Sequence, residues 1–242
     1  MQKKILAGAE IKGLSLWLPK QGIIAIADLH LGMEEEFRKK GALIPEFNFK
    51  ETMQKIALIF EKTGAVKTLV ICGDLKHEFG TISPQEWNEV IDFLRYCQKH
   101  CKRIVLLKGN HDSILGPLAH WEGLKVQEEF WLEKERMLFT HGDKIPASAE
   151  FKKAKAIVMG HEHPAVTIRE GAKAEKFKCF LKGKFAGKTL VVLPSFNSFN
   201  EGSDVLKESP LSPFLEKGLE EFEAWVLEGN ESYYFGKLKN LS

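Results

Sequence analysis

Six short, continuous apolar segments alternate with segments of helical pattern, and this alternation constrains the fold more than any other feature of the sequence. Continuous apolar segments are typical of strands that are buried on both faces. Apolar residues at positions 53, 56, 57 and 60 share one helical face, and Ser83-Pro84-Gln85-Glu86 is a capping box that begins another helix. The apolar segments are Ile23–Ala27, Thr68–Cys72, Ile104–Leu107, Met137–Phe139, Ala156–Met159 and Thr189–Leu193. Strands that alternate with helices predict a layered α/β fold.

The length fits one elaborated domain. The chain has 242 residues, of which 44% are hydrophobic and 28% charged, as in ordinary globular proteins. We therefore predict a single domain over residues 1–242. Its last part, about 201–242, is expected to be an irregular connection followed by a β-hairpin that turns at Gly229-Asn230.

Polar, metal-type side chains follow five of the predicted strands directly. Since the carboxyl ends of strands in an α/β sheet meet at one edge, these side chains are expected to converge there. One such block alone is typical of a turn, but five in succession predict a metal site. The blocks are Asp28-Leu29-His30, Gly73-Asp74-Leu75-Lys76-His77, Gly109-Asn110-His111-Asp112, Thr140-His141-Gly142-Asp143 and Gly160-His161-Glu162-His163.

These five blocks, in this order, make the chain resemble the calcineurin-like metallophosphoesterases. The signature of that superfamily is D-x-H, G-D, G-N-H-D, a single His followed by Gly, and G-H-x-H. The resemblance covers about residues 22–200, and within the superfamily the chain is similar to a largely archaeal, ICC-like group of prokaryotic phosphoesterases related to the SbcD nuclease. It implies a four-layer α-β-β-α sandwich that holds two divalent metal ions between its loops.

The resemblance also implies roles for individual residues. Asp74 would bridge the two metals, and His111 would face the scissile phosphate, oriented by Asp112. The remaining ligands would be Asp28, His30 and His163 for one metal, and Asn110, His141 and His161 for the other.

The chemistry of these residue types agrees with that assignment. Two cations roughly 3.5–4 Å apart clamp a phosphate and lower the pKa of a shared water. Because the donors are imidazoles and oxygens without a thiolate, Mn²⁺ is the leading candidate, with Fe or Zn as alternatives. As a cation, His111 would stabilise charge on the phosphate or protonate the leaving oxygen.

The expected activity is that of a dinuclear phosphohydrolase, in the first place a phosphodiesterase acting on nucleic acid or nucleotides with a metal-bridging hydroxide. Asp143 occupies a position at which many nucleases carry His. In this respect the chain is similar to the UDP-diacylglucosamine hydrolases. A phosphomonoesterase or a nucleotide-pyrophosphate hydrolase is therefore the alternative. A catalytically silent scaffold that binds a partner protein is a further one.

Candidate substrate-side residues are fewer and less specific. Residues 173–188 contain six lysines against one acidic residue, with phenylalanines interleaved. Such a stretch either tracks a nucleic-acid backbone or forms a solvated hairpin. The candidates are His77, Asn197, Asn200, Lys178 and Lys182.

Other features indicate the compartment. The four cysteines form no CxxC pair, which is not the pattern of a disulfide scaffold. The first residues lack the apolar segment of a signal peptide, and no apolar run approaches the roughly 18 residues of a membrane span. We expect a cytoplasmic protein without membrane contact; the sequence does not predict its oligomeric state.

Overall fold

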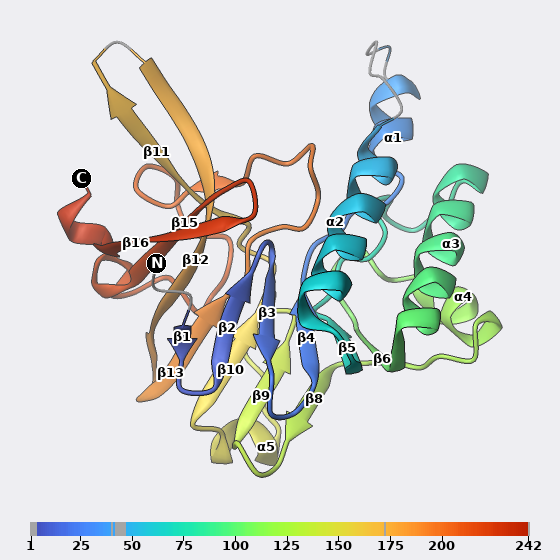
Figure 1. Ribbon diagram of the computed structural model, residues 1–242, viewed down its shortest axis with the longest axis horizontal. Coiled ribbons are helices and arrows are strands. Elements are labelled where there is room, and N and C mark those ends of the chain that lie inside the picture. The colour runs from blue at the N-terminus through green and yellow to red at the C-terminus, as the bar shows by residue number, and fades with distance from the viewer. Residues whose placement is uncertain (1–3, 40, 42–46, 172, 242) are drawn as a thin grey trace.

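Two β-sheets pack face to face in the computed structural model, which describes residues 4–39, 41, 47–171 and 173–241 (Figure 1). The first sheet has the strand order β1-β2-β3-β4-β5-β6-β7. Strands β1 to β4 pair antiparallel, and β4 to β7 pair parallel. The bounds are β1 Lys4–Leu6, β2 Ala9–Lys12, β3 Ser15–Leu18, β4 Ile23–Ile26, β5 Val66–Ile71, β6 Cys101–Leu107 and β7 Val126–Gln127.

The second sheet has the order β14-β11-β12-β13-β10-β9-β8, with a C-terminal hairpin of β15 and β16 attached to β12. Strands β9, β10 and β13 are parallel to one another. The bounds are β8 Glu129–Leu132, β9 Met137–Thr140, β10 Ala156–Met159, β11 Pro164–Glu170, β12 Lys173–Phe185, β13 Lys188–Val192, β14 Ser203–Asp204, β15 Glu223–Glu228 and β16 Glu231–Lys237.

Helices α1 to α4 gather on one side of the molecule, beside the first sheet (Figure 1). The capping box begins α3 as predicted, because the Ser83 hydroxyl accepts a hydrogen bond from the backbone N–H of Glu86 at 3.1 Å. None of the described helices is both long and apolar enough to cross a bilayer. The bounds are α1 Met33–Lys39, α2 Asn48–Thr63, α3 Pro84–His100, α4 Leu115–Trp121 and α5 Ala149–Lys153, with 3₁₀ turns η1 Leu219–Glu221 and η2 Leu238–Asn240.

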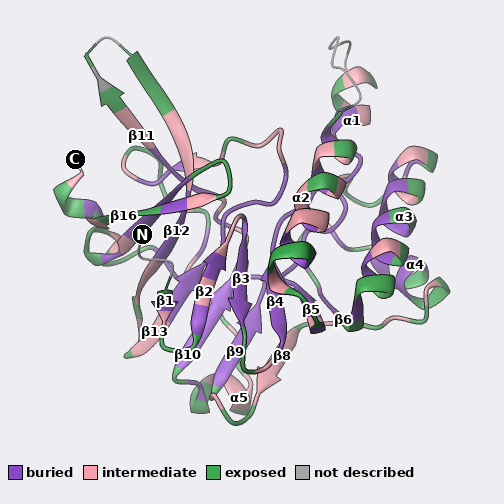
Figure 2. Cartoon of the chain, in the orientation of Figure 1, coloured by how far each residue is buried: buried purple, intermediate pink, exposed green. Residues whose placement is uncertain are grey.

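The buried residues concentrate in the two sheets (Figure 2). In β10, Val158 packs in the main core against the first sheet, whereas Ile157 and Met159 point to the outer face of the second sheet. That outer face is covered by Phe214, Phe222 and their neighbours, and α5 is the one α-helix beside them among the described residues. The fold is thus the expected metallophosphoesterase sandwich, with an irregular segment forming most of its fourth layer.

All six apolar segments form strands, so this part of the prediction is confirmed. The C-terminal hairpin also forms as expected, and β15 and β16 are joined at Gly229-Asn230. The two sheets meet at the carboxyl ends of their parallel strands, where Ala27 forms a parallel bridge to Ser195. The backbone N–H of Phe196 donates to the carbonyl of Ala27 at 2.9 Å. This junction brings the strand-end loops of both sheets to one edge.

Candidate metal centre

The polar strand-end blocks do converge at this edge. Two blocks follow β4 and β5, a third follows β6, and the last two follow β9 and β10 of the other sheet. Within the described residues, the ligand-type atoms form three groups, each with its atoms within 4.8 Å of one another. The groups are Asp28, His30 and His163; Asp74, His141 and His161; and His30, His77 and His111.

The backbone at this edge is unusual. Seven described residues other than glycine have a positive φ, and five of them are predicted metal ligands. Such a conformation costs roughly 1–3 kcal/mol per residue and persists only where the surroundings impose it. Here the loops hold one another: the N–H of Asp28 donates to the Gly73 carbonyl, and the N–H of His30 donates to the Asp74 carbonyl. The five ligands are Asp28, His30, Asp74, His161 and His163.

Glycines allow these loops to approach so closely. A Cβ atom on Gly109 would collide with the carboxylate of Asp74, and one on Gly160 would collide with Ala27 and Asp28. Both glycines belong to the signature blocks. They are therefore needed for the close approach of the chain to the ligands.

The first ligand group joins the two sheets. Nε2 of His30 lies 3.3 Å from Nε2 of His163, and Nε2 of His163 lies 3.5 Å from Oδ2 of Asp28. Both oxygens of Asp28 also accept the backbone N–H of His161, at 3.1 and 2.9 Å. One carboxylate thereby fixes the loop that carries the G-H-x-H motif.

The second group is centred on His141, which is 1% exposed. Its Nδ1 donates to the carbonyl oxygen of Cys72 at 2.9 Å, which directs Nε2 toward the cluster. Although burial opposes it, the charges of Asp74 and Asp28 raise the pKa of His141, so a metal at Nε2 must displace a proton. That Nε2 lies 2.9 Å from Oδ1 of Asn110 and 3.1 Å from Nδ1 of His161.

Asp74 lies between the two groups. Its Oδ2 is 3.7 Å from Nε2 of His30 and 3.6 Å from Nε2 of His141. Its Oδ1 accepts the backbone N–H of His111 at 2.9 Å, which fixes the orientation of the carboxylate. A shared carboxylate in this position is what two neighbouring cations require.

These distances fit metal coordination. Donors about 2.1 Å from one ion are separated by roughly 3.0–3.5 Å in octahedral or tetrahedral geometry, and the distances of 3.1 and 3.3 Å fall in that range. Burial, reinforced by the neighbouring imidazoles of His163 and His111, lowers the pKa of His30 well below its usual value. Burial likewise lowers the pKa of His161 to about 4. Both imidazoles are therefore neutral at pH 7, the form that binds a metal.

Metal binding should weaken as the pH falls below 7. Burial, opposed by His141 and reinforced by Asp28 and Asp112, raises the pKa of Asp74 in the metal-free protein to about 7. Below that pH a metal must displace the proton, so affinity should fall about tenfold per pH unit. Calorimetric titration with Mn²⁺ between pH 8 and 6 measures this slope. A pH-independent affinity would contradict the assignment of Asp74 as a ligand, and the slope should flatten in Asp74→Asn.

His111 is oriented by a different group from the one we predicted. Its Nδ1 donates to the backbone carbonyl of His77 at 2.5 Å, and its Nε2 faces the cluster, 3.9 Å from Oδ2 of Asp74. The carboxylate of Asp112 accepts the backbone N–H groups of Gly109 and Lys76 instead. The expected pairing of Asp112 with His111 is therefore wrong, because the oxygens of Asp112 are engaged in shaping the loop.

The charge state of His111 also differs from the expectation. Burial lowers its pKa to about 4, with the carbonyl of His77 opposing the shift. In the free protein the imidazole is thus neutral at pH 7 rather than cationic. An anion beside it would favour the protonated form.

Two of the substrate-side candidates, both asparagines, contact residues of the ligand loops. Asn197 is fully buried, and its amide donates to the carbonyls of Leu29 and His30 at 2.7 and 3.2 Å. The amide nitrogen of Asn200 lies 2.6 Å from Nδ1 of His163. Asn197 therefore positions the ligand loop rather than facing a substrate, and Asn200 holds a ligand ring.

The two lysines are likewise engaged with the protein. Lys178 donates to the backbone carbonyls of Ser195 and Asn197, and burial, with the nearby Lys55, lowers its pKa to about 7. Lys182 pairs with Glu223 at 2.9 Å, and its ammonium lies over the ring of Trp225. The structure does not bring Lys182 into the cluster, and Lys178 supports the loop that ends the second sheet.

Three further lysines of the stretch 173–188, which forms β12 and the start of β13, also donate hydrogen bonds to the protein. Besides these two lysines, Lys176, Lys184 and Lys188 donate to Gly202, to Thr189, and to Lys152 and Ala154. Its phenylalanines pack in the two cores. Of the two interpretations of this stretch, the structure favours the solvated hairpin, with alternate residues packed on the sandwich.

Several supporting residues were not predicted. The carboxylate of Glu162 accepts the N–H groups of Leu211 and Ser212, which fastens the G-H-x-H loop to the fourth layer. The buried ammonium of Lys76 donates to the carbonyls of Glu78 and Thr81 and orders the loop before α3. The position of Glu162 between the two histidines of the G-H-x-H motif is the sequence signal that could have revealed it. For Lys76 the sequence offers no comparable signal.

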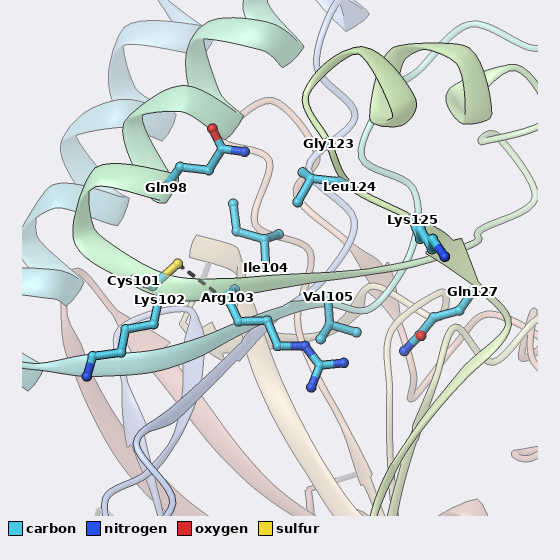
Figure 3. Close-up of a pocket in the computed structure, with 10 residues that line it drawn as sticks. All are labelled: Gln98, Cys101, Lys102, Arg103, Ile104, Val105, Gly123, Leu124, Lys125 and Gln127. Atoms are coloured by element: carbon cyan, nitrogen blue, oxygen red, sulfur yellow. Dashed lines mark hydrogen bonds between the residues drawn. The ribbon is translucent and has the colours of Figure 1, made fainter.

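A surface hollow at the start of β6 is distinct from the metal centre (Figure 3). Its lining includes Gln98, Lys102, Arg103 and Lys125, but no histidine or carboxylate. It lies at the amino end of β6, whereas Asn110 and His111 follow the carboxyl end. The hollow therefore does not belong to the metal centre.

With this geometry described, the chain can be placed among known proteins. Residues 22–150 match the model of the calcineurin-like phosphoesterase family. The chain belongs to this family and is a hydrolase that acts on phosphate esters. The G-H-x-H block lies beyond the matched residues, but the structure brings it to the other four blocks.

Solved structures share the fold at low sequence identity. The nuclease MPE of Pseudomonas putida is 19% identical, with 91% of each chain covered and a TM-score of 0.62. YfcE, a phosphoesterase from E. coli, is 17% identical over 89% of this chain and 97% of its own, with a TM-score of 0.41. Vps29 of Entamoeba histolytica, solved with Zn²⁺, is 15% identical over 88% and 96%, with a TM-score of 0.37. No curated protein sequence matches the chain.

Proposed function

We propose that the protein is a dinuclear metal-dependent phosphodiesterase that acts on nucleic acid or nucleotides, with Mn²⁺ as its preferred metal. One observation carries this proposal: Oδ2 of Asp74 stands 3.7 Å from His30 and 3.6 Å from His141, between two complete ligand groups. A single-metal site would not need a carboxylate shared in this way. The proposed ligands are Asp28, His30, His163 and Asp74 for one ion, and Asp74, Asn110, His141 and His161 for the other.

Two divalent ions held by these residues would polarise a phosphate ester and lower the pKa of a bound water. The protein's own part is to fix the ligands and to present His111 to the substrate. The carbonyl of His77 keeps a proton on Nδ1 of His111, so Nε2 is the atom that faces the phosphate. A phosphate at this position raises the pKa of His111 by its negative charge, and the imidazolium then protonates the leaving oxygen.

The surroundings of His111 favour a substrate with a flat aromatic group. The ring of Phe79 is 61% exposed, and its centroid lies 3.7 Å from that of His111. An exposed aromatic ring beside a phosphate site can stack on a nucleobase. The fold shared with the Pseudomonas putida nuclease MPE agrees with this substrate class.

The alternatives differ in substrate or in activity. A phosphomonoesterase or a nucleotide-pyrophosphate hydrolase would use the same metal centre on another phosphate. A silent scaffold would retain the fold without metal. In this chain, each ligand position of the superfamily signature carries a residue that can bind a metal. The four free, buried cysteines suit a reducing compartment, and we place the protein in the cytoplasm.

The proposal is tested by comparing Mn²⁺-supported hydrolysis of bis(p-nitrophenyl) phosphate and p-nitrophenyl phosphate, with Asp74→Asn as the blank. We expect the diester to be cleaved faster. Faster cleavage of the monoester would replace the proposal by its phosphatase alternative. Failure to retain two ions per chain would favour the scaffold.

A further inference from the structure

We propose that Glu36 and His77 are positioning residues that hold His30 in the tautomer able to bind a metal ion. The inference rests on the proposed metal centre. It adds two residues that supply no metal ligand in that assignment.

Three side chains form a continuous chain of contacts toward the cluster. Nε2 of His77 lies 2.7 Å from Oε2 of Glu36, and Nδ1 of His77 lies 3.4 Å from Nδ1 of His30. The other nitrogen of His30, Nε2, faces His163 at 3.3 Å and Asp74 at 3.7 Å. We call Glu36, His77 and His30 the relay.

With His77 in its neutral form, the donors and acceptors of the relay fit the following arrangement. A carboxylate only accepts, so Glu36 requires a proton on Nε2 of His77. Nδ1 of the neutral His77 is then an acceptor, and it accepts from Nδ1–H of His30. The proton of His30 thus lies on Nδ1, and Nε2 keeps the lone pair that points at the metal position.

The relay is held in place by the backbone. The N–H of His77 donates to the Leu31 carbonyl at 3.0 Å and to a carboxylate oxygen of Glu86 at 2.6 Å. The carbonyl of His77 holds His111. The ring of His77 also stacks on that of His111, with centroids 5.5 Å apart, so changes to the side chain remove this stacking but keep the backbone contact to His111 available.

The outer part of the relay lies at the rim of the cluster. Glu36 is 31% exposed at its side chain, and His77 is 14% exposed, so the pair is partly shielded from water. A hydrogen bond to an ionised partner in such a place is stronger than one in open solvent. This makes the carboxylate an effective means of fixing the imidazole.

Four variants separate this role from a merely structural one. His77→Asn places Oδ1 where Nδ1 stood and keeps the acceptor for His30, whereas His77→Leu removes it. Glu36→Gln keeps an acceptor for His77, whereas Glu36→Ala removes it. Glu35→Ala is the control on the same helix, since the contacts of Glu35 are to Lys39 at 3.2 Å and to the hydroxyl of Ser83.

The readout is calorimetric titration of the metal-free proteins with Mn²⁺, with thermal unfolding as the check on folding. Removing such a hydrogen-bond partner typically costs 10–100-fold in metal affinity. We expect His77→Leu and Glu36→Ala to weaken the binding of one of the two ions by that factor. His77→Asn, Glu36→Gln and Glu35→Ala should stay within a few-fold of the wild type.

Three results would overturn the inference. Wild-type affinity in His77→Leu would show that the relay does not matter, and equal losses in His77→Leu and His77→Asn would assign His77 a packing role. A third ion that disappears with His77→Leu would make His77 a ligand itself. Fewer than two ions in the wild type would instead refute the proposed dinuclear centre, so the two failures are distinguishable.

Discussion

Replacing Asp74 by asparagine should reduce the rate of phosphodiester hydrolysis by about 10³-fold or more. The neutral amide of an asparagine at this position cannot supply the negative charge shared between the two ligand groups, so at least one ion should be lost. A bound metal contributes several kcal/mol of transition-state stabilisation, and each 1.4 kcal/mol corresponds to about tenfold in rate. Mn²⁺-supported turnover and the metal content after dialysis measure the two effects separately.

The same variant has an expected effect of opposite sign on stability. Burial raises the pKa of Asp74 to about 7, so the folded metal-free protein holds this proton more tightly than the unfolded chain. The stability of the metal-free protein therefore falls as the pH rises from about 4 toward 7, and at pH 8 the buried charge is a cost. Asp74→Asn removes that cost, and its melting temperature without metal should equal or exceed that of the wild type. A variant that melts earlier would mean that the lost activity reflects damage to the fold.

Replacing His111 by alanine should lower the turnover by about 10²–10⁴-fold and leave both metal ions bound. His111 is absent from both proposed ligand sets, and in the proposed mechanism its Nε2 acts on the reacting phosphate. Turnover under saturating Mn²⁺, together with the metal content of the same preparation, checks both halves of the expectation.

His120→Ala is a matched control for that experiment. His120 is exposed on α4, outside the cluster, and its loss should leave turnover unchanged. Full activity of His111→Ala with metal bound would refute the role of His111. Loss of an ion in His111→Ala would instead place it among the ligands.

The core strands and the convergence of the ligands were predictable because both depend on local patterns. A continuous apolar segment such as Ile23–Ile26 has few stable alternatives to a buried strand. Parallel strands bring their carboxyl ends together, so the residues that follow β4, β5 and β6 had to meet. The short antiparallel strands β1 to β3 carry a weaker pattern in the sequence and were not predicted.

The residues that support the ligands were less predictable, because their roles depend on contacts between distant segments. Asn197 follows a strand, as a substrate-side residue would, yet its amide turns toward the loop of Leu29 and His30. Asp112 is adjacent to His111 in the sequence, but the partner of His111 is the carbonyl of His77. The residues that flank Asn197 and Asp112 in the sequence do not indicate which contact each side chain makes.

The left-handed backbone at five proposed ligand positions links the stability of the chain to its proposed function. Glycine would relieve about 1–3 kcal/mol of strain at each of these positions, and each such change would delete a ligand. The substitutions that would relieve this backbone strain are therefore the ones that would remove proposed metal ligands. A screen for thermal stability in this chain therefore needs a metal-dependent readout beside it, so that variants without a proposed ligand are recognised.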